Sequence, residues 1–148
     1  MASTIHASAV LVGARAVLIQ GPPGSGKSRL ALALLQAANQ GALPFARLVA
    51  DDRAQVEAAH GRLLVRPAAA LAGLIEMRGL GIRRVPYEPL AVVGLLTELG
   101  LAETKRLPDA ADRHAEIAGI ALPRLAVAAG ADPLPLVLAH LLTRDGLA

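Results

Sequence analysis

One short segment, residues 21–28, constrains the fold of this chain more than any other. It has the spacing G-x-x-x-x-G-K-S, with glycines at 21 and 26 followed by Lys27 and Ser28. An apolar run at 15–20 leads into it, and strong helix formers follow at 28–39. Between a strand and a helix, such a loop surrounds phosphate oxygens with backbone N–H groups. We therefore expect a phosphate-binding loop, or P-loop, in an α/β domain.

The residue types within this loop indicate a nucleoside triphosphate and Mg²⁺ as its ligands. Glycines let the backbone approach phosphate closely, Lys27 supplies a cation for the β- and γ-phosphates, and the Ser28 hydroxyl is a Mg²⁺ ligand. Pro22 and Pro23 remove two backbone donors, but the positions nearest the lysine keep theirs. The candidate nucleotide-binding residues are Gly21, Gly24, Ser25, Gly26, Lys27 and Ser28.

Hydrophobic periodicity and turn residues predict the remaining elements. The fold class is α/β: a mixed sheet with flanking helices around the P-loop, in a single domain over residues 1–148. The pattern leaves 70–78 open between helix and strand, and it predicts a polar surface loop at 99–116. Predicted strands are 5–12, 15–20, 46–52, 54–59, 62–66 and 90–98, with a hairpin turn at His60-Gly61 and one or two more strands in 117–128. Predicted helices are 28–39 and 133–144, the latter capped by Asp132.

Composition excludes several other classes of protein. Hydrophobic residues make up 54% of the 148, but there is one Tyr, one Phe and no Trp, so the core is aliphatic and stacking platforms for nucleic acid are missing. The net charge of +3 comes from scattered arginines, which favours a solvated basic surface over a nucleic-acid footprint. No apolar run is long enough for a membrane span, and an export signal is not evident. The absence of cysteine suits the cytoplasm.

Two groups of acidic residues are candidates for the chemistry beside the loop. Asp51 and Asp52 end an apolar strand, where a carboxylate can hold Mg²⁺ through water or accept a proton from an attacking hydroxyl. A solvated turn is the alternative. Glu76 and Arg78 would share one face of a strand, either in a site or as an ordinary surface ion pair.

Four blocks follow one another along the chain: residues 5–8, the loop 21–28, residues 48–52 and residues 75–82. In this order they resemble HPr kinase/phosphorylase, specifically the catalytic domain in the short form found in alphaproteobacteria. The last block is similar to the signature I-E-[IV]-R-G-L-G-I, with Met77 as its variation. The resemblance covers roughly residues 4–143.

This resemblance implies an ATP- and Mg²⁺-dependent serine kinase acting on the phosphocarrier HPr of a phosphotransferase system. It also implies a homo-oligomer, the family's assembly being a hexamer. The roles carried over are an active-site histidine at His6, a phosphate-binding Lys27, Mg²⁺ ligands at Ser28 and Glu76, a general base at Asp52 that serves as general acid in reverse, and an active-site-loop arginine at Arg113.

The chain also departs from the family pattern. The proline-glycine-arginine-asparagine stretch linked to the reverse, phosphorylase reaction is replaced by residues 128–132, so that reaction is expected to be weak or absent. Pro23 stands where the family has serine. Without the resemblance, His6 alone favours a core or strand-edge histidine. The competing functions are a small-molecule P-loop kinase, with 103–116 as its lid, and a nucleotide-binding regulatory module without catalysis.

Overall fold

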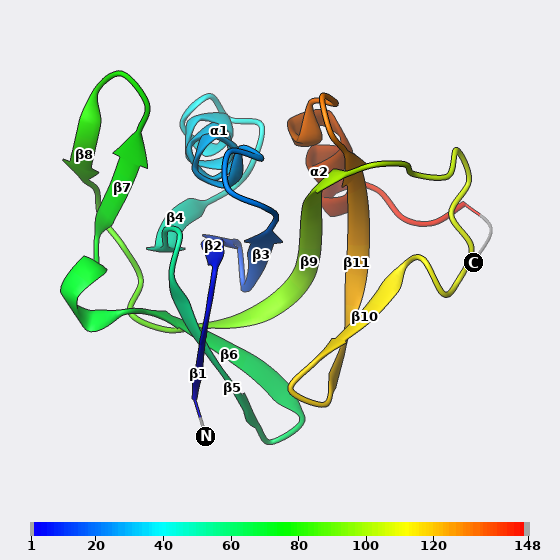
Figure 1. The fold of residues 1–148 in the computed structure, drawn as a ribbon, viewed down its shortest axis with the longest axis horizontal. Coiled ribbons are helices and arrows are strands. Elements are labelled where there is room, and N and C mark those ends of the chain that lie inside the picture. Colours follow the sequence, from blue (N-terminus) through cyan, green and yellow to red (C-terminus); the bar gives the residue numbers. More distant parts are fainter. Residues whose placement is uncertain (1, 147–148) are drawn as a thin grey trace.

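The predicted strand, loop and helix at the start of the chain are all present. The computed structural model describes residues 2–146. Strand β2 (Ala7–Val12) pairs antiparallel with β3 (Arg15–Gln20) through a turn at Gly13, and helix α1 (Lys27–Asn39) follows the loop. In Figure 1 this unit occupies the centre of the molecule, with α1 above the strands. The strand–loop–helix arrangement predicted from the apolar runs and the glycines is therefore confirmed.

Within residues 2–146, the strands form one mixed sheet of nine and a separate two-stranded hairpin. The path through the larger sheet is β1-β5-β6-β9-β3-β2-β4, and the β10–β11 pair joins it through β9. Its other strands are β1 (Ser3–Ile5), β4 (Ala46–Ala50), β5 (Ala54–Ala59), β6 (Arg62–Pro67), β9 (Ala91–Leu101), β10 (His114–Ile117) and β11 (Ile120–Ala128).

Strand directions bring several chain segments to the same edge of the sheet. Strand β2 is antiparallel to both β3 and β4, so β3 and β4 run the same way. Strand β9 is parallel to β3, and β11 is parallel to β9. The carboxyl ends of β4, β3, β9 and β11 therefore share one edge, where α/β sheets bind their ligands.

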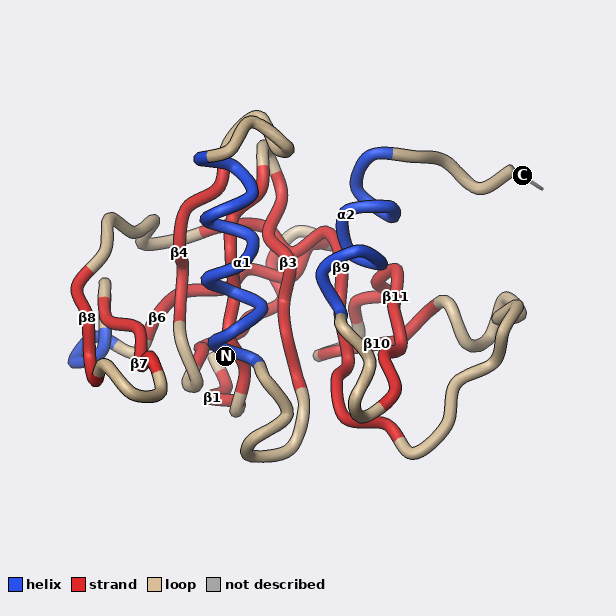
Figure 2. The backbone as a smooth tube through the Cα atoms, turned by 90° about the horizontal axis from the view of Figure 1, so that it is seen from above, coloured by secondary structure: helices blue, strands red, loops and turns tan. Residues whose placement is uncertain are grey.

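The two helices cover only one face of this sheet. Helix α2 (Pro133–Leu142) begins after Asp132, whose side chain accepts the Leu134 N–H at 3.1 Å, as the sequence predicts. Leu30 of α1 and Val137 of α2 pack in one cluster with Val10, Val17 and other strand residues. Figure 2 shows α1 and α2 on the same side of the strands. Within residues 2–146, no helix has both the length and the apolar character needed to cross a lipid bilayer.

The opposite face is covered by the sheet itself, so the expected flanking helices lie on one side only. Leu18 and Ala9 from the central strands pack there against Leu63 and Val65 of β6 and Val56 of β5. The hairpin β5–β6, which turns at His60-Gly61 as predicted, therefore curls across the sheet in place of a helix layer.

Several predicted boundaries were wrong because pairing with distant strands decided them. The run 5–12 is broken at His6, since residues 3–5 pair with β5 while β2 pairs with β3 and β4. The loop predicted at 99–116 spans only 102–113, because β9 extends to Leu101 beside β11 and β10 begins at His114. The strand predicted at 46–52 ends at Ala50.

The open segment 70–78 contains a short 3-10 helix, Ala69–Leu71, and strand β7 (Leu74–Met77). In the described part of the chain, strand β7 pairs only with β8 (Gly81–Arg84), which the sequence did not predict. These two strands form a hairpin that stands apart from the main sheet on the side of α1 (Figure 1).

The central strand β3 should carry much of the stability of the fold. Leu18 is fully buried in the layer under the β5–β6 hairpin, whereas Leu107 is 80% exposed in the 102–113 loop. Leu18→Ala should lower the free energy of unfolding by about 2–5 kcal/mol, because it removes buried methyl groups and leaves a cavity. Leu107→Ala should change it by less than about 0.5 kcal/mol. Urea denaturation of both variants checks this, and equal effects would contradict the assigned core.

Candidate phosphate-binding site

The glycine loop turns directly from β3 into α1. Gly26 is the N-cap of the helix and has a φ of 101°, a left-handed conformation in which a side chain would be strained. Its carbonyl accepts the Leu30 N–H at 2.9 Å, which begins the helical hydrogen bonding. The N–H groups of the first turn of α1 therefore point toward the loop, where they can face an anion.

Lys27 is folded into this loop. Its side chain is buried, and Nζ donates a hydrogen bond to the Gly21 carbonyl at 3.0 Å and a longer one to that of Pro22 at 3.4 Å. The ammonium group therefore lies inside the curve of the backbone, at the position where phosphate oxygens would meet both the cation and the helix N-terminus.

The carboxylate of Asp51 connects the loop to two other parts of the chain. Asp51 is buried, and its Oδ1 accepts hydrogen bonds from the hydroxyls of Ser28 at 2.6 Å and Ser8 at 2.8 Å. Its Oδ2 accepts the backbone N–H of Glu76 at 3.0 Å. These three donors offset the cost of burying the charge. Strand β2, the P-loop and the β7–β8 hairpin are thus fixed to one acid.

Asp52 differs from the buried Asp51 in its exposure and in its backbone conformation. It is exposed and adopts a left-handed backbone with a φ of 63°. Its N–H donates to the Ser8 hydroxyl at 3.1 Å, and its carbonyl accepts the Ala7 N–H at 3.0 Å. These bonds hold the residue at the end of β4 with its carboxylate toward solvent, which is a geometry open to a second molecule.

Ser8 is a residue of the site that the sequence analysis missed. It is fully buried, and its single hydroxyl donates to Asp51 while accepting from the Asp52 N–H. A serine within an apolar strand gives no local signal of such a role. The signal is the pairing of β2 with β4, which places the two acids beside it.

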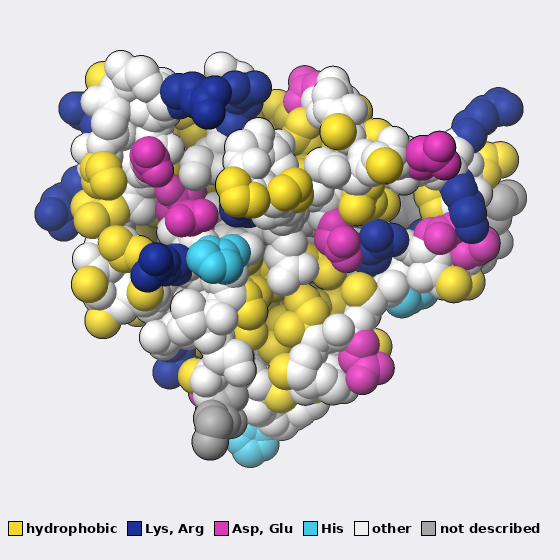
Figure 3. All heavy atoms as spheres, in the orientation of Figure 1, with side chains coloured by type: hydrophobic (Ala, Val, Ile, Leu, Met, Phe, Trp, Pro, Cys, Tyr) yellow, Lys and Arg dark blue, Asp and Glu magenta, His cyan; other side chains and the backbone are white. Residues whose placement is uncertain are grey.

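Glu76 lies on strand β7 of the hairpin and is the residue through which the hairpin is hydrogen bonded to Asp51. Its backbone is tied to Asp51, and its own side chain is exposed. In the register of the hairpin it is opposite Ile82. Figure 3 shows acidic, basic and histidine side chains gathered on this face, between the hairpin and the centre of the molecule.

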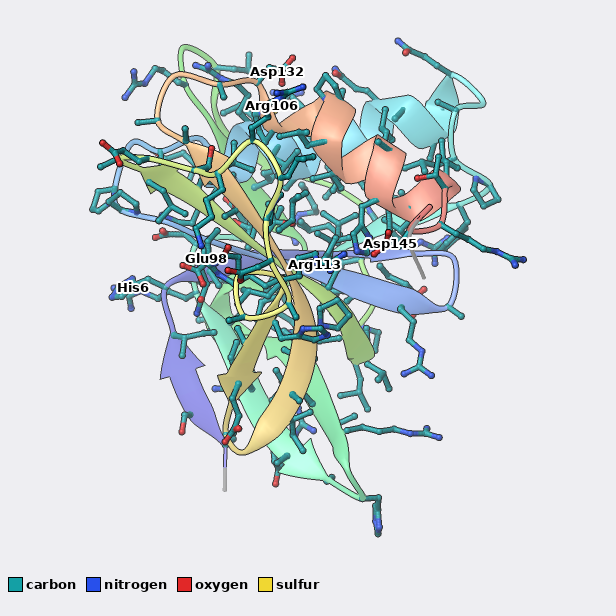
Figure 4. The ribbon with its side chains drawn as sticks, turned by 90° about the vertical axis from the view of Figure 1, so that its right-hand side faces the viewer. His6, Glu98, Arg106, Arg113, Asp132 and Asp145 are labelled. Carbon is teal, nitrogen blue, oxygen red and sulfur yellow. The ribbon has the colours of Figure 1, made fainter. Side chains whose placement is uncertain are left out.

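The structure places His6 near this group and Arg113 elsewhere. His6 is exposed and directly precedes Ala7, which is hydrogen bonded to Asp52. The guanidinium of Arg113 forms an ion pair with Asp145, beyond α2. In Figure 4, His6 lies at one side of the molecule, and Arg113 points toward Asp145 instead. Of the predicted residues, the structure therefore brings together Lys27, Ser28, Asp52, Glu76 and the neighbourhood of His6.

The 102–113 loop that carries Arg113 is held by an exposed ionic network. Lys105 contacts Asp112 at 2.9 Å and Asp109 at 3.1 Å, and these hydrogen bonds raise the pKa of Lys105. The hydrogen bond from Lys105 in turn lowers the pKa of Asp109. Ion pairs among the loop's own residues therefore stabilise its conformation.

The acidic residues beside the loop suit Mg²⁺, which keeps water and phosphate ligands, better than a metal ion whose ligands all come from protein side chains. Residues 2–146 contain no group of three or more His, Cys, Asp or Glu side chains arranged to hold a metal ion. Magnesium typically takes one or two carboxylates and completes its shell with water and substrate phosphates. The Ser28 hydroxyl donates to Asp51 and so keeps its oxygen lone pairs for a cation, which fits such a site.

Fold and site together define a class: a mixed α/β protein with a glycine-rich loop between a strand and a helix, and acids gathered beside that loop. The family model described as the HPr Serine kinase C-terminal domain matches residues 1–87. The chain therefore belongs to the family of HPr serine kinase C-terminal domains, as the four sequence blocks indicated.

Individual relatives agree with this family. The HPr kinase/phosphorylase of Streptococcus pneumoniae is 34% identical over 136 residues, which are 84% of this chain and 42% of that protein. That of Streptococcus thermophilus is 42% identical over 81 residues, or 54% of this chain and 24% of that protein. The chain thus spans less than half the length of either relative. The HPr(Ser) kinase/phosphatase of Coxiella burnetii has the same fold, with a TM-score of 0.74, 24% identity, and coverage of 94% of this chain and 88% of that one.

The hydrogen bonds of Asp51 predict that its charge matters for folding. In Asp51→Asn an amide NH₂, which is a hydrogen-bond donor, would replace one carboxylate oxygen and face the donor that this oxygen now accepts from. The variant should therefore lose about 1–3 kcal/mol of unfolding free energy. Asp52→Asn is the matched control, because asparagine adopts left-handed backbone readily and the side chain is exposed; it should stay within about 0.5 kcal/mol. Chemical denaturation measures both, and a neutral Asp51→Asn would contradict the assigned contacts.

Proposed function

We propose that the chain is an ATP- and Mg²⁺-dependent kinase that phosphorylates a serine of an HPr-like phosphocarrier protein. One observation carries this proposal: the buried Asp51 carboxylate joins Ser28 of the P-loop to the strand end at Asp52 and to the hairpin that bears Glu76. A phosphate-binding loop, a candidate base and a candidate metal ligand therefore meet in one place. The family of the chain supports HPr as the acceptor.

In this proposal the loop binds the phosphates of ATP. The ammonium group of Lys27 leaves its contacts with the Gly21 and Pro22 carbonyls for the β- and γ-phosphate oxygens, while the N–H groups at the start of α1 donate to them. Ser28 and Glu76 would hold Mg²⁺, which when bound neutralises charge on the phosphates as the γ-phosphoryl group is transferred.

Asp52 is proposed as the general base. The hydroxyl oxygen of the acceptor serine forms a bond to the γ-phosphorus, the bond from that phosphorus to the oxygen of the leaving ADP breaks, and the serine proton passes to the Asp52 carboxylate. Its exposure leaves the carboxylate accessible to a protein substrate, and Ser8 holds its backbone in place. His6 directly precedes Ala7, whose N–H donates to the Asp52 carbonyl, and would lie beside the incoming serine. Arg113 would take part only after releasing Asp145.

The reverse reaction, attack of inorganic phosphate on phosphoserine, is proposed to be weak. Two anions must approach each other there, and the repulsion has to be offset by cations and backbone donors. The turn at 128–132 provides alanines, a glycine and an aspartate where the family has its proline-glycine-arginine-asparagine stretch. That turn therefore brings no added cation to the phosphate.

Transfer of label from radiolabelled ATP to an HPr-like protein, followed by mapping of the phosphosite, tests the proposed function. The wild type should phosphorylate one serine in the presence of Mg²⁺. Asp52→Asn should lower turnover by about 10²–10⁴-fold while ATP binding persists, because it removes only the base. Glu116→Gln, which removes an exposed carboxylate on β10, should leave the rate unchanged.

Two results would contradict the proposal. The first is label on a small molecule and none on the carrier, which would favour a small-molecule kinase. The second is ATP binding with no transfer by the wild type, which would indicate a regulatory module. Release of pyrophosphate from phosphoserine-HPr and inorganic phosphate at a rate close to the forward rate would overturn the claim of a weak reverse reaction.

A further inference from the structure

A small hollow opens beside the P-loop, on the side away from the acids. Its volume is about 250 Å³, below the roughly 300–1,000 Å³ of pockets for drug-sized ligands, so it suits one ring system more than a whole nucleotide. Its walls are Pro22 and Pro23 of the loop, Leu99 and Gly100 of β9, Ala128 at the end of β11, and the turn 129–131 after it. The lining is mainly proline, glycine, alanine and aliphatic side chains.

The order of strands places this hollow opposite the acids across the loop. The loop follows β3, with β9 and β11 on one side of that strand and β2 and β4 on the other. The hollow is formed by the ends of β9 and β11, whereas Asp51 follows β4. A ligand whose terminal phosphates meet Lys27 and Ser28 would therefore extend along the loop with its other end in the hollow. In Figure 1 the same order appears, with the hairpin on one side of α1 and β9, β11 and α2 on the other.

The walls of the hollow are held by fixed backbone contacts. Gly100 has a φ of 74°, and a Cβ at this position would lie 3.0 Å from Cδ of Pro22, so β9 can approach the loop this closely only with glycine here. The Ala129 N–H donates to the Leu101 carbonyl at 2.7 Å, which ties the turn after β11 to the end of β9. The hollow is therefore preformed by the ends of rigid elements.

Polar side chains in the hollow are few, so the polar groups that line it come mainly from the backbone. The only hydroxyl side chain in its lining is that of Ser25, whose Oγ is buried and has no hydrogen-bond partner within residues 2–146. The lining includes no amide, carboxylate or basic side chain that could read the edge of a base. A larger hollow of about 470 Å³ lies near Gly73 and Tyr87 at the base of the hairpin. Its lining includes no residue of the P-loop 21–28.

We propose that the hollow beside the P-loop binds the base of the nucleoside triphosphate and recognises it by shape and apolar contact, with little selection among purines. This proposal rests on the proposed function, because it takes the loop to hold the phosphates. Sites that pair with the edge of a substrate reject wrong ones by about 10⁴–10⁵-fold, whereas apolar pockets discriminate against polar isosteres by only about 10²-fold. The dissociation constants for ATP and GTP should therefore differ by less than about 100-fold.

Calorimetric titration of Mg·ATP and of inorganic tripolyphosphate with Mg²⁺ separates the base from the phosphates. Ala129→Phe and Ala131→Phe place a ring at the turn that lines the hollow. At least one of them should weaken ATP binding by roughly tenfold or more and leave tripolyphosphate binding unchanged, since it competes only with the buried base. Ala42→Phe, at an exposed turn after α1, is the matched control and should change neither ligand. Unchanged tripolyphosphate binding also shows that a variant is folded.

Lys27→Ala distinguishes failure of this proposal from failure of the proposed function. It should weaken both ligands. If it does so while both phenylalanine variants bind ATP normally, or lose ATP and tripolyphosphate equally, the base does not bind in the hollow although the P-loop proposal stands. If Lys27→Ala weakens neither ligand, the loop does not hold the phosphates and both proposals fall. A difference above about 100-fold between ATP and GTP would overturn recognition by shape alone.

Discussion

The three hydrogen bonds accepted by the buried Asp51 carboxylate are the interaction on which the candidate site depends. Their donors, the hydroxyls of Ser8 and Ser28 and the backbone N–H of Glu76, come from a strand, the P-loop and a separate hairpin. A buried carboxylate without such partners would be costly, so the charge and its donors require one another. Because the hairpin pairs with no strand of the main sheet among the described residues, the bond from Glu76 to Asp51 is one of the contacts that fix its position beside the loop.

The sheet determines what lies on each side of that junction. Four strands run in the same direction, and the segments that follow them meet at one edge. The loop is in the middle, with acids on the β4 side and, on the β9–β11 side, a hollow lined mostly by apolar side chains. This arrangement matches that of a nucleoside triphosphate, which has charged phosphates and a metal at one end and a flat, uncharged aromatic base at the other. The proposed kinase function and the proposed base-binding hollow both follow from it.

Local signals in the sequence predicted the parts of the fold that are decided locally. The glycine loop between strand and helix, the turn at His60-Gly61 and the Asp132 cap depend on neighbouring residues, and each was found where expected. The break at His6, strand β8 and the extension of β9 depend on partners distant in the chain, which one sequence does not display. The same reason separates the site residues: Lys27 and Ser28 follow from their motif, while the role of Ser8 and the central place of Asp51 appear only when β2 lies beside β4.

In the proposed kinase, the metal and the phosphates meet where the loop, the acids and the hairpin converge. Nuclear magnetic resonance of the ¹⁵N-labelled chain with ATP and Mn²⁺ in place of Mg²⁺ tests it directly, because the paramagnetic ion broadens the signals of nearby amides. We expect the strongest broadening at Ser28, Asp52 and Glu76, dependent on ATP, with no broadening of β10 and the His60-Gly61 turn. Broadening centred on another part of the molecule, or the same broadening without nucleotide, would contradict it.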